Sequence, residues 1–258
     1  MNRVMYSTFH VLGYSLPSYW TMFVIGLLTM ILINVLRRKK IMFSVGRAVL
    51  YTMLLALFSL AGAKLLYAVE NWKQFLSNGV TLNGVSFFGS VFLLPVVMYL
   101  VCKWRKIPYG AFMDYCSPSL MAMLSILRVG CYLNGCCGGI TVPVGEYSTM
   151  TVPTQMLECI GDLTILGVLL MVEWHYSGRG LLYPYILVLY GAMRFIVEFF
   201  RDTPKDWLYL SHGQWFAMAS TVIGSWYLYG LMKKISEENP RQTSGKRSRK
   251  TKQRNKRR

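Results

Sequence analysis

Residues 190–201 have the sequence Tyr190-Gly-Ala-Met-Arg194-Phe-Ile-Val-Glu198-Phe-Phe-Arg201, a mostly apolar segment that carries three charged side chains. On a helix, Arg194 and Glu198 lie four residues apart and share one face, and Arg201 follows two turns after Arg194 on the same face. Charged side chains in a membrane span are costly, and they occur where they are paired, face protein or water, or take part in function. The stretch therefore predicts a functional site at the end of a membrane-spanning helix.

The composition around this stretch is that of a membrane protein. Of the 258 residues, 54% are hydrophobic and only 15% are charged, whereas about a quarter of the residues of a soluble domain are charged. We predict an all-α polytopic membrane protein in which residues 1–235 form the membrane domain and residues 236–258 form a basic, disordered tail. Seven transmembrane helices are expected, at roughly 18–36, 48–69, 84–102, 111–129, 154–173, 180–200 and 213–232.

The basic residues predict the orientation of these spans. With the N-terminus outside and the C-terminus inside, 21 of the 28 lysines and arginines fall on the inner side and only four on the outer side. Positive charge marks the cytoplasmic side of membrane proteins. The tail is expected to contact anionic lipids of the inner leaflet. The net charge of +17 does not predict a nucleic-acid partner, because much of it lies in the tail and in short turns between apolar runs.

This orientation gathers unusual polar and glycine-rich segments at the outer boundary of the membrane. Arg128 and Arg194 would lie at a similar depth there, and a guanidinium group binds phosphate oxygens in a bidentate manner. Gly135 and Gly139 allow a close approach of the backbone to a ligand. The sequence therefore predicts a cavity that takes a phospholipid sideways from the bilayer.

Six blocks of sequence resemble the prolipoprotein diacylglyceryl transferase family, and they keep the family's order over roughly residues 18–232. Residues 128–139, Arg-Val-Gly-Cys-Tyr-Leu-Asn-Gly followed by Gly138-Gly139, resemble its signature loop, and residues 190–201 resemble its second arginine motif. Lys64-Leu-Leu-Tyr67 resembles its Arg-Leu-Gly-Tyr segment, with lysine in place of the arginine. The other blocks are Tyr19 ahead of Gly26, Pro153-Thr-Gln155 with Glu158, and Gly213-Gln214.

The resemblance implies a function and a site. Family members transfer the diacylglyceryl group of phosphatidylglycerol to the lipobox cysteine in the signal peptide of a prolipoprotein, at the outer face of the bacterial cytoplasmic membrane. No cofactor, metal or nucleic acid is implied. The implied catalytic residues are Arg128, Arg194 and Glu198, and the implied substrate-binding residues are Tyr19, Asn134, Gly139, Gln155, Glu158, Tyr190, Arg201 and Gln214. His212 is a further catalytic candidate, chosen for its expected place at the outer face.

The chain also departs from the family pattern. Phe88 stands where the family has a histidine, and Cys131 and Cys136 stand where it has an asparagine and an acidic residue. His212 is the candidate replacement base. Two alternatives stay open: a related phospholipid-dependent transferase that uses the clustered cysteines, and a non-catalytic lipid-binding protein.

The three clustered cysteines, Cys131, Cys136 and Cys137, allow several interpretations. Their Cys-x4-Cys-Cys spacing is not typical of a zinc site. Three other interpretations remain. One of the thiols could accept a lipid or acyl group transiently, the cysteines could be small buried side chains, or they could form a structural disulfide.

Overall fold

The structure is a computed structural model that describes residues 8–11, 14–72, 87–144, 148–176, 178–205 and 208–255. The described part is a helical bundle with two short β-hairpins, which confirms the all-α prediction. Its long helices are α1 (Ser18–Arg37), α2 (Val45–Glu70), α4 (Phe87–Arg105), α5 (Tyr109–Leu133), α6 (Thr154–Tyr176), α7 (Leu182–Val197) and α8 (His212–Asn255). The 3-10 helices are η1 (Arg38–Ile41) and η2 (Glu198–Phe200), and the hairpins pair β1 (Thr8–Val11) with β2 (Tyr14–Pro17) and β3 (Thr141–Val144) with β4 (Ser148–Thr151).

Each of the seven predicted spans coincides with one of these helices. Five stretches of the described part, in α1, α2, α5, α6 and α7, are long and apolar enough to cross a membrane. Helix α8 continues to Asn255, beyond the predicted end of the membrane domain at residue 235. The separate tail at residues 236–258 therefore stays a prediction.

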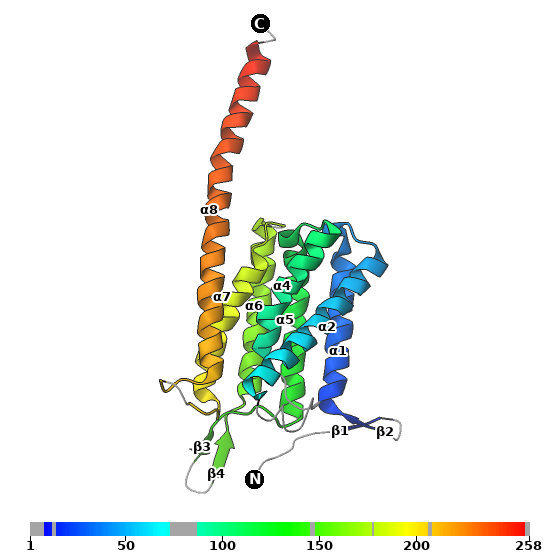
Figure 1. Cartoon of the computed structure of the whole chain (residues 1–258), viewed down its shortest axis with the longest axis vertical. Coiled ribbons are helices and arrows are strands. Elements are labelled where there is room, and N and C mark those ends of the chain that lie inside the picture. Colours follow the sequence, from blue (N-terminus) through cyan, green and yellow to red (C-terminus); the bar gives the residue numbers. More distant parts are fainter. Residues whose placement is uncertain are drawn as a thin grey trace.

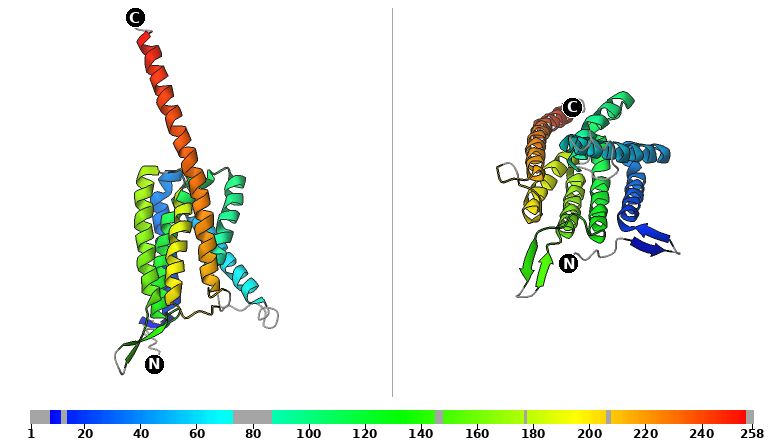
Figure 2. Two further views of the ribbon diagram at one scale, coloured as in Figure 1. Left: turned by 90° about the vertical axis from the view of Figure 1, so that its left-hand side faces the viewer. Right: turned by 60° about the horizontal axis from the view of Figure 1, so that its bottom comes forward.

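The helices run alternately up and down the bundle (Figures 1 and 2). Helices α1, α6 and α8 begin at the lower end of Figure 1, where α5 and α7 end, and both hairpins lie there as well. We call this the site end. The C-terminal part of α8 projects beyond the opposite end, so β1 and the last turns of α8 lie at opposite ends of the bundle. A chain that crosses a membrane an odd number of times has its termini on opposite sides.

Helix α5 lies at the centre of the bundle, packed against α1, α6, α7 and α4. Its first half carries polar residues such as Asp114 and Ser117, which are unusual in a membrane span. These side chains are buried inside the bundle and have partners there: the Ser117 hydroxyl donates to the Met113 carbonyl at 2.7 Å. A polar side chain in a span is tolerated when it faces protein rather than lipid.

Asp114 joins α5 to the start of α7. Its carboxylate accepts hydrogen bonds from the backbone N–H groups of Gly180 at 2.7 Å and Leu182 at 2.9 Å. Asp114→Ala leaves both buried donors without this acceptor, and each unsatisfied donor costs about 1–3 kcal/mol. We expect the variant to unfold more readily than the parent in a thermal melt in detergent. Asp114→Asn keeps one acceptor oxygen, so its melting temperature should lie between those of the parent and the alanine variant. Melting temperatures equal to the parent's for both variants would contradict this role.

The opposite end of the bundle has a charged group of its own. Glu173 on α6 accepts hydrogen bonds from Arg37 at 2.6 and 2.9 Å and pairs with Lys40 at 2.8 Å. Close by, Phe43, Tyr51, Phe112 and Tyr115 form an aromatic cluster in the core. This end therefore provides matched control positions for experiments on the site end.

Candidate active site

Three arginines from different segments converge on one buried carboxylate at the site end. Glu158, in the second turn of α6, is 0% exposed. Its Oε2 lies 2.7 Å from Arg128 Nε on α5, and its Oε1 lies 2.8 Å from Arg194 Nη1 on α7 and 3.2 Å from Arg201 Nη1. The carboxylate therefore holds the three guanidinium groups together, where their mutual repulsion would otherwise separate them.

Glu198 is the second carboxylate of the group and binds two of the same arginines. Its Oε2 lies 2.6 Å from Arg194 Nη1 and 3.7 Å from Arg201 Nε. The predicted i, i+4 pair of Arg194 and Glu198 is thereby confirmed. We call Arg128, Glu158, Arg194, Glu198 and Arg201 the arginine cluster.

The predicted path of the chain to Arg201 is wrong in one respect. Helix α7 ends at Val197 and the chain continues through η2, so Arg201 does not lie two turns along the same helix. Its backbone is extended and forms an antiparallel bridge with Gly139. A Cβ atom at Gly139 would collide with the Phe200 carbonyl oxygen. Glycine is therefore required here for the close approach that brings Arg201 to Glu158.

Glu198 is held in place by hydroxyl groups on the connection to α8. The hydroxyls of Ser211 and Thr203 donate to its Oε1 at 2.9 and 3.0 Å. Gln214 in turn fixes Ser211 through two hydrogen bonds. The Gln214 side-chain Oε1 accepts the backbone N–H of Ser211 at 2.9 Å, and the backbone N–H of Gln214 donates to Ser211 Oγ at 3.2 Å. In the structure Gln214 therefore positions Ser211, and its predicted role in binding substrate stays a prediction.

Tyr190 connects the arginine cluster to an apolar cavity. Arg128 Nη2 donates to its hydroxyl at 2.9 Å. Tyr190 also lines a cavity of about 80 Å³ whose other walls include Leu124, Ile186 and Leu187. A larger cavity of about 320 Å³, bordered by Arg47 and Arg105 among others, lies at the opposite end of the bundle.

The loop after α5 is fastened to the start of α6. Gln155 Nε2 donates to the Cys136 carbonyl at 2.6 Å, and the Thr154 hydroxyl donates to the Cys137 carbonyl at 3.0 Å. Gly135, with φ of 68°, begins the loop just after α5. Gln155, another predicted substrate-binding residue, is thus used in shaping this loop.

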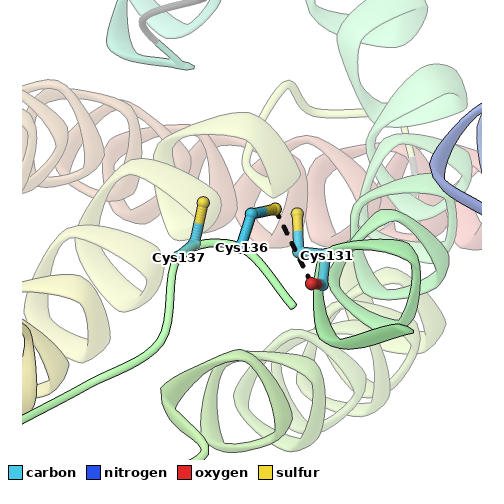
Figure 3. A group of neighbouring side chains, drawn as sticks. All are labelled: Cys131, Cys136 and Cys137. Carbon is cyan, nitrogen blue, oxygen red and sulfur yellow. Dashed lines mark hydrogen bonds between the residues drawn. The ribbon is translucent and has the colours of Figure 1, made fainter. Parts of the chain in front are cut away.

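The same loop brings three thiols together. The Sγ atoms of Cys131, Cys136 and Cys137 all lie within 4.8 Å of one another (Figure 3). Hydrogen bonds from the Cys131 and Cys136 thiols, together with the positive charge of Arg201, lower the pKa of the Cys137 thiol. All six cysteines of the chain are described, and none forms a disulfide in the structure.

Three of the predicted site residues lie at the site end outside the arginine cluster. Tyr19 is half-buried in the first turn of α1, close to Gly130, where an added Cβ would lie 3.8 Å from the Tyr19 Cα. Asn134 is exposed at the C-terminus of α5, and His212 is exposed at the start of α8. The roles predicted for these residues, including that of His212 as a base, stay predictions.

Sequence reasoning missed two hydroxyl residues at this end. Ser211 and Thr203 are hydroxyl residues in a connection without a motif, and only the fold brings them to Glu198. Asp162 lies one turn after Glu158 on α6 and is fully buried, with no hydrogen bond to either carboxylate oxygen from the residues that the structure describes. A carboxylate in a membrane span is rare, so the sequence already marks Asp162, and it leaves open whether this residue packs helices together or belongs to a site.

The charges of the arginine cluster favour an anionic ligand. Three guanidinium groups face two glutamates, which leaves one positive charge over. Guanidinium groups suit phosphate because their N–H donors match its oxygens in geometry and charge. The arrangement can hold a phosphodiester and stabilise the charge that develops when one of its ester bonds breaks.

Comparison with known proteins gives one consistent result. The family model described as prolipoprotein diacylglyceryl transferase matches residues 7–230. A phosphatidylglycerol–prolipoprotein diacylglyceryl transferase of Clostridium tetani is 26% identical over 232 residues, which cover 84% of this chain and 93% of the relative. A second such protein, from Clostridium perfringens, is 24% identical over 86% of this chain and 93% of its own length. One from Methylobacillus flagellatus is 31% identical over 57% of this chain and 60% of its own length.

Proposed function

The chain belongs to the prolipoprotein diacylglyceryl transferase family, and from this premise we propose the reaction that it catalyses. It transfers the diacylglyceryl group of phosphatidylglycerol to the lipobox cysteine of a prolipoprotein. The sulfur of that cysteine attacks the glyceryl carbon that carries the phosphate ester. A thioether forms, and glycerol phosphate leaves with the electron pair of the broken C–O bond.

The arginine cluster is the observation that carries the proposal. Arg128, Arg194 and Arg201 are held by Glu158 at 2.7–3.2 Å within the protein itself. Donors fixed in advance do not have to reorganise when charge develops on the leaving phosphate, which is how electrostatic catalysis lowers a barrier. Arg128 and Arg194 bind the phosphate, and Glu158 and Glu198 keep their guanidinium groups in position.

The surroundings of Tyr190 support a lipid substrate. Its hydroxyl contacts Arg128, while its ring lines the apolar cavity between α4, α5 and α7. A lipid with its phosphate at Arg128 would have its glyceryl and acyl groups on the apolar side. Tyr190 therefore lies at the boundary between the phosphate-binding and the acyl-binding parts of the site.

The acceptor thiol needs a route for its proton, because the thiolate is the nucleophile. Phe88 stands at the position of the family histidine and cannot take a proton. His212 is exposed at the start of α8, at the site end, and is the imidazole that we assign to accept the proton. Gly213, next in the chain, lies beside Glu198, because an added Cβ there would be 2.9 Å from Glu198 Oε1.

We further propose that all seven helices span the bacterial cytoplasmic membrane, with the site end at the outer side. The alternating directions of the helices and the concentration of basic residues at the other end support this orientation. The basic residues from Lys233 onward would then contact anionic lipids of the inner leaflet.

The test uses the purified chain in vesicles that contain phosphatidylglycerol, together with a synthetic lipobox peptide. Mass spectrometry should show one diacylglyceryl group added to the peptide's cysteine, and a peptide with serine in place of that cysteine should stay unmodified. If the cysteine peptide also stays unmodified, the chain does not catalyse transfer from phosphatidylglycerol to a lipobox cysteine, and the proposal is wrong.

A further inference from the structure

The three thiols at the end of α5 form a compact group that the arginine cluster does not use. Cys131 lies in the last turn of α5, and Cys136 and Cys137 lie on the loop that follows. Their side chains point into one common space in Figure 3, although four residues separate the first from the second. Their Sγ atoms lie within 4.8 Å of one another.

The backbone is arranged to present these side chains. The carbonyl groups of Cys136 and Cys137 are taken up by Gln155 and Thr154 of α6, and the Cys136 N–H donates to the Cys131 carbonyl at 3.1 Å. Cys137 has a left-handed backbone with φ of 61°, which is uncommon for a residue other than glycine. The main-chain groups are thus held on one side, and on the other side the three sulfur atoms lie together, with the Cys136 thiol donating to the Cys131 carbonyl at 3.6 Å (Figure 3).

We propose that Cys131, Cys136 and Cys137 bind one zinc ion as three thiolates and leave its fourth coordination position to the cysteine thiol of the acceptor peptide. Zinc takes four ligands in a tetrahedron with Zn–S bonds of about 2.3 Å, which places the sulfur atoms about 3.8 Å apart. The observed Sγ separations, all within 4.8 Å, are compatible with that value. Thiolates are soft ligands that select zinc over magnesium or calcium.

The graded exposure of the three residues explains why one coordination position stays open. Cys131 is buried, Cys136 is half-buried and Cys137 is exposed, so the group is closed on one side and accessible on the other. A site with three protein ligands and one open position is the arrangement of a catalytic zinc, whereas structural zinc has four protein ligands.

The position of the thiols relates them to the transfer reaction, and this part of the proposal rests on the proposed function. Gln155, which holds the Cys136 carbonyl, precedes Glu158 by one turn of α6. An acceptor thiol bound at the open position would therefore be next to the arginine cluster that holds the phosphate. The site would supply thiolate activation in a chain that has Phe88 in place of the family histidine.

The step balances without an oxidant or reductant. Cys131, Cys136 and Cys137 would hold the metal as thiolates, their protons passing to solvent. The metal would lower the pKa of the acceptor thiol, whose proton would pass to His212, the base assigned above. The acceptor sulfur then forms the C–S bond as the glyceryl C–O bond breaks. Its electron pair leaves with glycerol phosphate, and the neutral thioether dissociates because it is a weaker ligand than a thiolate.

The first experiment tests metal binding alone. The parent chain, purified under reducing conditions, should hold one zinc per chain by elemental analysis. Cadmium added in its place should give a sulfur-to-metal charge-transfer band.

Cys137→Ser, an exposed position, should weaken zinc binding by more than about tenfold. Cys102→Ser on α4, at the opposite end of the bundle, is the matched control and should bind as the parent does. Metal binding by the triple serine variant equal to that of the parent, or a disulfide within the group in the intact mass of the native protein, overturns the proposal.

The second experiment tests the fourth position. Transfer to the lipobox peptide should fall at least tenfold when a chelator removes the zinc, and it should return when zinc is restored. Cys137→Ser should lose transfer in the same way, while Cys102→Ser should not. Full transfer by the metal-free parent refutes the role in the reaction. The parent could also bind zinc, exchange it for cadmium, and still transfer no lipid to the peptide. That result would refute the proposed function but would support the metal site.

Discussion

Arg194→Ala is expected to lower diacylglyceryl transfer by about 10²–10³-fold, the cost of losing one fixed donor to a developing anion. Arg194 Nη1 contacts both Glu158 at 2.8 Å and Glu198 at 2.6 Å, so it is the arginine that joins the two carboxylates. Its removal takes away a phosphate ligand and the surplus positive charge of the arginine cluster. The measurement is the initial rate of peptide modification in phosphatidylglycerol vesicles, with Arg128→Ala expected to behave alike.

Two further variants make this result specific. Arg194→Lys keeps the charge but not the planar fork of donors, and we expect its rate to lie between those of the parent and the alanine variant. Arg37→Ala removes an arginine that is also paired with a buried glutamate, Glu173, but at the opposite end of the bundle. It should leave the rate nearly unchanged. Full transfer by both Arg128→Ala and Arg194→Ala would show that the arginine cluster does not hold the substrate.

Glu158→Ala is expected to have the largest effect on stability. It leaves three arginines without the carboxylate that they share, and breaking a buried ion pair from one side costs about 3–5 kcal/mol. The free energy of unfolding in detergent should fall by that amount, and transfer should be lost with it because the guanidinium groups separate.

Glu158→Gln is the informative comparison, because it keeps the size and one acceptor oxygen but removes the charge. We expect a smaller loss of stability than for alanine together with a marked loss of transfer. Glu173→Gln changes a carboxylate with two basic partners at the opposite end and should leave transfer intact. Normal stability of Glu158→Ala would contradict this role, because it would mean that other groups hold the three arginines together.

The sequence predicted those parts of the fold that follow from local periodicity and charge. Each of the seven apolar runs coincides with a helix, because a long apolar segment has no other way to satisfy its backbone in a membrane. The ion pair of Arg194 with Glu198 follows from their spacing on one helix.

Contacts between distant segments could not be predicted in the same way. Nothing local indicates that Arg128 and Arg201 meet at Glu158, because that depends on how α5, α6 and α7 pack. The end of α7 at Val197 was missed because the apolar pattern continues through Phe199 and Phe200. The sequence showed that Cys131, Cys136 and Cys137 are near one another along the chain, but not that all three Sγ atoms lie within 4.8 Å, which depends on the path of the loop, including the left-handed backbone of Cys137.

The most direct test of the arginine cluster as the phosphate site of a transferase is the stoichiometry of the two products. Phosphatidylglycerol labelled in its headgroup is supplied to the parent chain with a lipobox peptide. We predict that one glycerol phosphate is released for each thioether formed, and that Arg194→Ala releases neither product above background. Release of glycerol phosphate by the parent without thioether formation, or equal yields from parent and variant, would contradict the account.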